Sequence, residues 1–165
     1  MFAIGVTAFN KNQTGLTGVA NGGQRVGRFG FELLDVGIRV AILPLADLAA
    51  LDAMRPDFPR LKALGGPLGI TVFYPFVYDH ASARVRARSF APAVDIDEDP
   101  ATGTATASLG AYLAREGLVE ETAELRVRQG EAMGRPSELR LRIEHQDRRP
   151  RRIRVGGPVT GEPAG

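Results

Sequence analysis

Alternating polar and apolar positions mark four stretches of the chain as half-buried β-strands. In Arg84–Phe90 arginine occupies every second position, and the same period of two recurs in 126–128, 139–143 and 152–155. This period places one side chain toward a core and the next toward solvent. We therefore expect four strands whose polar faces carry nine arginines: Arg84, Arg86, Arg88, Arg126, Arg128, Arg140, Arg142, Arg152 and Arg154.

Two further stretches are apolar without alternation and predict buried strands. Gly37–Leu43 is rich in β-branched and aliphatic residues and stops at Pro44, whereas Ile70–Phe76 adds aromatic residues. Between them, Ala46–Arg55 has an apolar stripe at helical spacing that ends at Pro56. Phe2–Phe9 predicts one more strand near the start of a glycine-rich segment.

The principal helix is predicted from about Thr102 to Glu116, and its first two-thirds contain no charged residue. A helix that is small and apolar on most sides belongs in an interior. Alanines and glycine at positions such as Ala105 and Gly110 would let a sheet approach its backbone closely. We expect an α+β fold in which a curved mixed sheet wraps around a central helix.

Composition fits one soluble globular domain. The chain has 165 residues, 44% of them hydrophobic and 24% charged, with a formal net charge of +2. It has no cysteine, which excludes disulfides, thiolate zinc sites and cysteine nucleophiles. We find no signal peptide and no apolar run near the roughly 18 residues of a membrane span, so we expect a cytoplasmic protein without membrane contact.

Candidate chemistry lies where an acidic loop runs into the start of the predicted helix. The first amides of a helix lack internal acceptors and, with the helix dipole, favour an anion. Thr102 and Thr104 add hydroxyl groups, Gly103 permits close approach, and Asp99 could accept from helix amides or from a substrate amine. Two interpretations stay open: Asp99 or Thr102 is a simple N-cap, or these residues bind a ligand.

Other chemistries find little support. The acidic run fails as an EF-hand because Pro100 replaces the required glycine, and Ser108 fails as a nucleophile elbow because it lies inside the helix. His80 and His145 have no partner that suggests a metal pair, and we expect both on the surface. We predict no metal site and no nucleic-acid binding, because no aromatic residues are interleaved with the arginines.

Three motifs in order resemble the PhzF-like phenazine-biosynthesis family. They are RSFAPAVDIDEDPATGTA followed by the small-residue helix, then RQGEAMGRPSELRLRI, and finally RIRVGGPV. The resemblance covers roughly 36–159 and matches the family's C-terminal half. It divides the chain into a poorly readable segment 1–35, a PhzF-like domain 36–159 and a tail 160–165. It implies one half of a diaminopimelate-epimerase-like fold, with the active site between two halves.

The resemblance also implies roles. Asp99 would be the second-half acid, and Thr102, Gly103 and Thr104 would bind the substrate at the helix start; Thr104 stands where family members commonly have serine. Proton transfer in this family needs no metal or organic cofactor. The family's first-half glutamate motif and Gly-His motif have no counterpart in residues 1–35.

Three hypotheses follow. The first is a PhzF-like isomerase that acts by cofactor-free proton transfer on a small anionic amino or hydroxy acid. Its partner would be a second copy of the chain or a separate first-half chain. The second is a truncated, catalytically inactive protein that binds a small acid. The third is a polyanion-binding module that uses the arginine faces.

Overall fold

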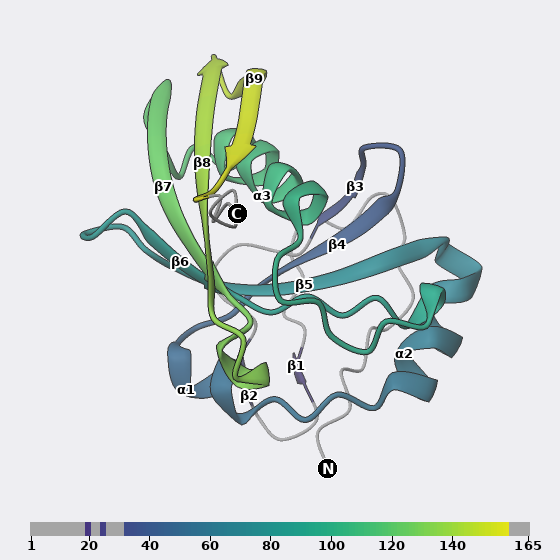
Figure 1. Ribbon diagram of the computed structural model, residues 1–165. Coiled ribbons are helices and arrows are strands. Elements are labelled where there is room, and N and C mark those ends of the chain that lie inside the picture. The colour runs from purple at the N-terminus through teal and green to yellow at the C-terminus, as the bar shows by residue number, and fades with distance from the viewer. Residues whose placement is uncertain (1–18, 21–23, 26–31, 159–165) are drawn as a thin grey trace, which may run out of the picture.

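A seven-stranded sheet organises the described part of the chain (Figure 1). The computed structural model describes residues 19–20, 24–25 and 32–158. The strands follow the order β3-β4-β5-β6-β7-β8-β9, and β1 (Val19–Ala20) and β2 (Gln24–Arg25) form a separate pair. The strands of the large sheet are β3 (Glu32–Asp35), β4 (Arg39–Pro44), β5 (Ile70–Asp79), β6 (Arg84–Ala87), β7 (Thr122–Gln129), β8 (Ser137–Gln146) and β9 (Arg149–Gly156).

The sheet is mixed because two of its pairings are parallel. β4 pairs parallel with β5, and β6 pairs parallel with β7, whereas the other neighbours are antiparallel. Parallel neighbours need long crossovers. The first contains α1 (Leu48–Ala53), α2 (Phe58–Gly65) and the short 3-10 helix η1 (Gly66–Leu68). The second contains the 3-10 helix η2 (Pro92–Val94), the acidic loop and α3 (Gly103–Arg115).

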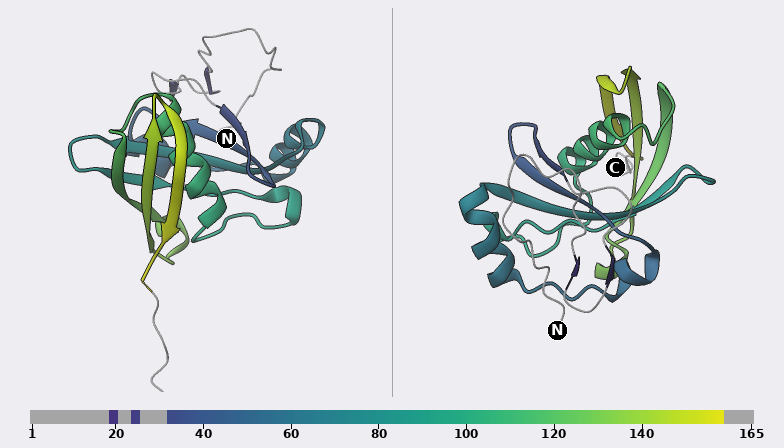
Figure 2. Two further views of the ribbon diagram at one scale, coloured as in Figure 1. Left: turned by 90° about the horizontal axis from the view of Figure 1, so that it is seen from above. Right: turned by 180° about the vertical axis from the view of Figure 1, so that it is seen from behind.

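The sheet curls, and α3 lies in its hollow (Figures 1 and 2). The helix contacts β8 and β9 at one edge and β3 and β4 toward the other. This arrangement confirms the prediction of a curved mixed sheet. The small residues of α3 explain the close approach: a Cβ built on Gly110 would lie 3.0 Å from Leu141 Cδ1 and 3.2 Å from Ile153 Cγ2.

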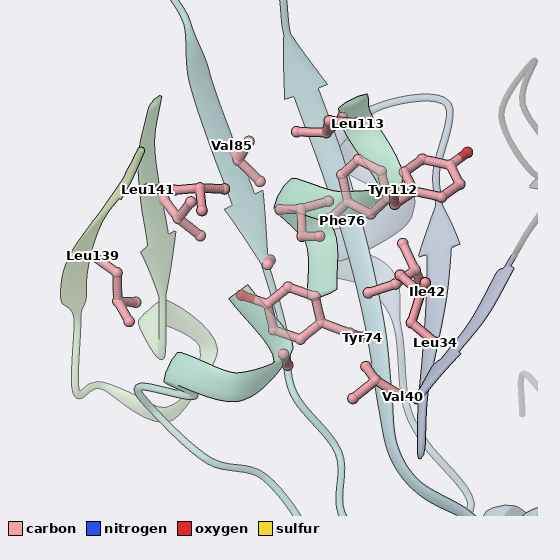
Figure 3. Close-up of a cluster of buried hydrophobic side chains, with 14 of the residues drawn as sticks. Leu34, Val40, Ile42, Tyr74, Phe76, Val85, Tyr112, Leu113, Leu139 and Leu141 are labelled. Carbon is pink, nitrogen blue, oxygen red and sulfur yellow. The ribbon is translucent and has the colours of Figure 1, made fainter. Parts of the chain in front are cut away.

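The inner side of the sheet and α3 share one apolar core (Figure 3). Tyr74, Phe76, Leu113 and Leu141 are all almost completely buried there, and the Phe76 and Tyr112 rings form a T-shaped pair with 5.8 Å between centroids. Inward positions alternate with exposed ones along β7 and β8, as the period of two predicts.

A second, smaller core lies on the opposite side of β4 and β5. Phe73 and Phe90 pack there with Leu61 of α2, and α1 and α2 cover this side in both figures. Because the sheet is covered on both sides here, β4 and β5 are buried at successive positions and show no alternation.

The expected elements agree with the structure in kind and differ at their ends. The strand predicted at Gly37–Leu43 is β4, the helix predicted at Thr102–Glu116 is α3, and α1 is shorter than the predicted Ala46–Arg55. Sequence patterns missed α2, which begins directly after its N-cap residue Asp57. The strand predicted at Phe2–Phe9 lies outside the described residues.

Two expectations about polar residues were wrong. Arg88 does not project into solvent with the other strand arginines, since only 8% of it is exposed. His145 is likewise buried, at 9% exposure, and its Nε2 lies 3.1 Å from the carbonyl oxygen of Val119. Arg88, just beyond β6, lies against the end of α1 and the acidic loop, whereas His145 continues the inward face of β8 after Leu141 and Ile143. No helix in the described ranges is long and apolar enough to cross a membrane.

Candidate functional site

The acidic loop before α3 is fixed by a buried ion pair. Arg88 binds Glu98 with two parallel hydrogen bonds, Nε to Oε1 at 2.9 Å and Nη2 to Oε2 at 2.8 Å. Only 10% of the Arg88 side chain and 12% of the Glu98 side chain are exposed. Arg88 Nη1 also donates to the carbonyl oxygen of Met54 at 2.9 Å, and the guanidinium lies over the Phe90 ring. A bidentate pair of this kind fixes the orientation of the two side chains as well as the distance between them.

Asp99 follows directly and is held by its own main chain. Its N–H donates to the carbonyl oxygen of Ser89 at 3.0 Å. Its carboxylate accepts two hydrogen bonds, from the Thr102 hydroxyl to Oδ2 at 2.6 Å and from the Ala101 N–H to Oδ1 at 3.3 Å. The residue as a whole is half-buried.

The start of α3 is left open. Thr102 is the N-cap residue, but its hydroxyl turns to Asp99 and makes no cap hydrogen bond to the helix. Within the described part of the chain, the N–H groups of Gly103, Thr104 and Ala105 have no acceptor, and the first internal bond runs from the Thr106 N–H to the Thr102 carbonyl oxygen. Free amides of this kind attract an anion.

Gly103 and Thr104 face outward at this helix start. Both residues are exposed, and a Cβ built on Gly103 would meet no atom within 4 Å. Space for an approaching group therefore exists beside the free amides. Thr102 is thus the N-cap residue by position, but its side chain accepts no hydrogen bond from the helix amides.

A buried polar cluster supports the site from behind. Gln129, the last residue of β7, is 1% exposed; its Nε2 donates to the Asp99 carbonyl oxygen at 2.6 Å and to Thr102 Oγ1 at 3.0 Å. Its Oε1 accepts from the Tyr74 hydroxyl at 3.0 Å, and Tyr74 in turn lies 3.0 Å from Thr106 Oγ1. Burial raises the pKa of the Tyr74 phenol above its usual value, so this group remains a proton donor.

The four predicted site residues thus lie together, and the structure adds others that sequence reasoning missed. Gln129 occupies an inward position of β7 after Leu125 and Val127, where the alternation predicts an apolar side chain. That polar residue at an apolar position was the available signal. Arg88 gave no signal, because its spacing matches the exposed arginines of the same strand.

The remaining acidic and basic residues are less closely tied to the helix start. Asp95 pairs with Lys62 at 2.7 Å on the surface, and Asp97 is exposed.

On the outer side of the sheet Glu131 binds both Arg86 and Arg128. Arg142 pairs with Glu124 at 2.9 Å, so several of the strand arginines are neutralised locally.

Comparison with known proteins identifies the family of this chain. The profile of the family described as phenazine biosynthesis-like protein matches residues 3–162. An uncharacterized isomerase of Deinococcus radiodurans is 37% identical over 132 residues, which are 78% of this chain and 42% of that protein. The trans-2,3-dihydro-3-hydroxyanthranilate isomerase of Pseudomonas chlororaphis is 34% identical over 129 residues, 78% of this chain and 44% of that protein.

Solved structures show the same fold. The phenazine biosynthesis protein of Bacillus anthracis, of the PhzF family, superposes with a TM-score of 0.58 and 23% identity over 72% of this chain and 41% of that chain. The chain belongs to the phenazine biosynthesis-like, or PhzF, family, whose relatives include named isomerases. It spans less than half the length of these relatives.

Proposed function

We propose that this chain forms one half of a PhzF-type isomerase site, in which a small anionic amino or hydroxy acid undergoes cofactor-free proton transfer. In this proposal the chain is one lobe of a diaminopimelate-epimerase-like fold, with α3 as its central helix. The observation that carries the proposal is the open start of α3, where the free amides of Gly103, Thr104 and Ala105 lie beside the Asp99 carboxylate.

Each part of this site has a task in the proposed reaction. The free amides would bind the substrate carboxylate and stabilise negative charge that develops when a proton leaves carbon. Asp99, already an acceptor of two hydrogen bonds, would take a donor such as a substrate amine or assist the proton's movement. The family resemblance assigns the principal base to the other half.

A second body would complete the site. Val94, at the end of η2, and Ile96, in the acidic loop, are 53% and 46% exposed. Exposed apolar side chains that form a patch are typical of surfaces that another body covers. We propose that a second copy of the chain, or a chain that supplies the first half, packs here. Sedimentation at micromolar concentration tests this proposal. The proposal is contradicted if the protein sediments as a monomer both by itself and in mixtures with candidate partner chains.

Deuterium exchange tests the chemistry. The protein, alone and with any first-half partner, is incubated in heavy water with trans-2,3-dihydro-3-hydroxyanthranilate and with a panel of amino and hydroxy acids. Carbon-bound hydrogen should exchange, and Asp99→Asn should slow exchange by about 10²-fold or more. The matched control is Asp97→Asn, an exposed carboxylate of the same loop, which should leave the rate unchanged.

The inactive acid-binding alternative gives a different result. A protein that only binds would show saturable binding of 3-hydroxyanthranilate, the aromatic counterpart of the relatives' named substrate, without any exchange at carbon. Exchange that is equally fast in Asp99→Asn would remove Asp99 from the proposed chemistry.

A further inference from the structure

We propose that Gln129 is a positioning residue, which fixes the direction of a hydrogen-bond chain that ends on the Asp99 carboxylate. The chain runs from the Gln129 side-chain amide to the Thr102 hydroxyl and from there to Asp99 Oδ2. This role goes beyond the family resemblance, and its catalytic part rests on the function proposed above.

The orientation of the Gln129 amide follows from its fixed neighbours. A main-chain carbonyl can only accept, so the atom that lies 2.6 Å from the Asp99 carbonyl oxygen must be the amide nitrogen. The Thr102 N–H can only donate, and it faces Gln129 Oε1 at 3.5 Å. A rotated amide would bring two acceptors together at one end and two donors at the other.

This orientation decides where the Thr102 proton lies. The second N–H of Gln129 Nε2 points to Thr102 Oγ1 at 3.0 Å, so the hydroxyl oxygen accepts there. A hydroxyl has one proton, and the remaining partner of Thr102 Oγ1 is Asp99 Oδ2 at 2.6 Å. Asp99 is thereby held as an acceptor, with one oxygen engaged from inside the protein.

Burial makes the arrangement rigid. Gln129 is 1% exposed, and Tyr74, whose hydroxyl donates to Gln129 Oε1, is 0% exposed. A buried amide that lost these partners would pay the full cost of desolvation, so the cluster has one favourable arrangement. Because Gln129 ends β7 and Tyr74 lies in β5, the sheet itself fixes the carboxylate relative to the helix start.

The experiment first reads Asp99 without any substrate. The ¹³Cγ resonance of Asp99 and the side-chain amide resonances of Gln129 are recorded by NMR for the wild type and for Gln129→Met, which keeps similar length but no amide. We expect the Asp99 resonance to move in Gln129→Met and in Thr102→Val. It should return toward the wild-type position in Thr102→Ser, which restores the hydroxyl.

The matched control is Ser108→Ala. Ser108 is also fully buried in α3, and its hydroxyl donates only to the Thr104 carbonyl oxygen. Removing this hydroxyl therefore deletes a buried hydrogen bond that does not belong to the hydrogen-bond chain from Gln129 to Asp99. This variant should leave the Asp99 resonance in place. An Asp99 resonance that is unmoved in folded Gln129→Met overturns the proposal. If Gln129→Met does not fold, an identical Asp99 resonance in Thr102→Val and Thr102→Ser overturns it instead.

Gln129→Glu gives an independent check. A glutamate side chain there has a donor to offer the Asp99 carbonyl only when it is protonated, and burial raises the pKa of a carboxyl group. We expect the thermal stability of this variant, relative to wild type, to recover as the pH falls and to be lost as the pH rises. Gln129→Met should show no such recovery. A loss of thermal stability that does not depend on pH in either variant would count against the proposed direction of the hydrogen bonds.

Catalysis is read separately. In the heavy-water assay, Gln129→Met should lower the exchange rate about 10-fold to 100-fold, as expected when a reacting group is displaced slightly. Absence of exchange in the wild type would overturn the proposed function while the NMR result still decides the role of Gln129. Exchange at the wild-type rate in Gln129→Met would show that the hydrogen-bond chain from Gln129 to Asp99 has no catalytic role.

Discussion

The two ends of α3 differ in how their unpaired backbone groups are satisfied. At the C-terminal end, Gly117 adopts φ of +66° and its N–H donates to Ala114, while the Leu118 N–H donates to Leu113. This pair of bonds is a Schellman motif, which closes the helix with its own backbone. At the N-terminal end, three amides have no acceptor among the described residues.

The difference teaches that an open helix end needs support from elsewhere. The closed end requires one glycine and an apolar contact from Leu118, which packs against the core. The open end is held by side chains that arrive from other elements: Gln129 from β7, Tyr74 from β5, and Arg88 just beyond β6. Side chains that hold the loop without occupying the amides leave them available to a ligand.

The largest effect should come from the buried ion pair. Arg88→Met leaves Glu98 charged and buried, and we expect a loss of about 3–5 kcal/mol in the free energy of unfolding. Denaturant unfolding measures it. The control is Arg142→Gln, in an exposed pair, which should cost at most about 1 kcal/mol. Equal losses in the two variants would show that the loop is not held by Arg88.

Gly130→Ala should be the next largest. Gly130 has φ of +79°, and an added Cβ would lie 2.3 Å from the Arg135 carbonyl oxygen and 2.9 Å from Pro100 Cβ. We expect a loss of about 3 kcal/mol and a displaced Asp99 loop. Gly134→Ala is the control, because φ is +68° there but no atom lies within 4 Å, so only about 1–2 kcal/mol of conformational strain applies.

Gly117→Ala tests the closed end of the helix. The left-handed conformation should cost about 1–2 kcal/mol, and the nearby Arg148 side chain can move aside. Thermal unfolding measures the loss. Because the site lies at the other end of α3, binding of 3-hydroxyanthranilate should be unchanged, and a weakened titration would break the distinction between the two ends.

The smallest effect on stability should come from Gly103→Val. Nothing lies within 4 Å of an added Cβ, so the unfolding free energy should change by about 1 kcal/mol or less. Binding of 3-hydroxyanthranilate, followed by calorimetry, should nevertheless weaken, because the side chain would stand over the free amides. Unaltered affinity would place the ligand elsewhere.

Local patterns in the sequence predicted most strands and α3, and they singled out the four candidate residues at the start of α3. The alternation of arginine with apolar residues was sufficient to predict strands β6 to β9. The uncharged run from Thr102 was sufficient to predict a buried helix.

The same alternation misplaced Arg88, because a period of two reports which face a residue occupies and not whether other elements cover that face. His145 was expected on the surface because it had no apparent partner, although it continues the inward face of Leu141 and Ile143. Local patterns also passed over Gln129, whose partners are 27, 30 and 55 positions away in the chain.

By itself, the sequence determined the periodicities and the acidic run before a small-residue helix, since these depend on neighbours a few positions apart. Only the tertiary structure decided that the Thr102 hydroxyl serves Asp99 and leaves the helix uncapped. That outcome depends on β5, β7 and α3 meeting in one buried cluster, where every polar group must find a partner once water is excluded.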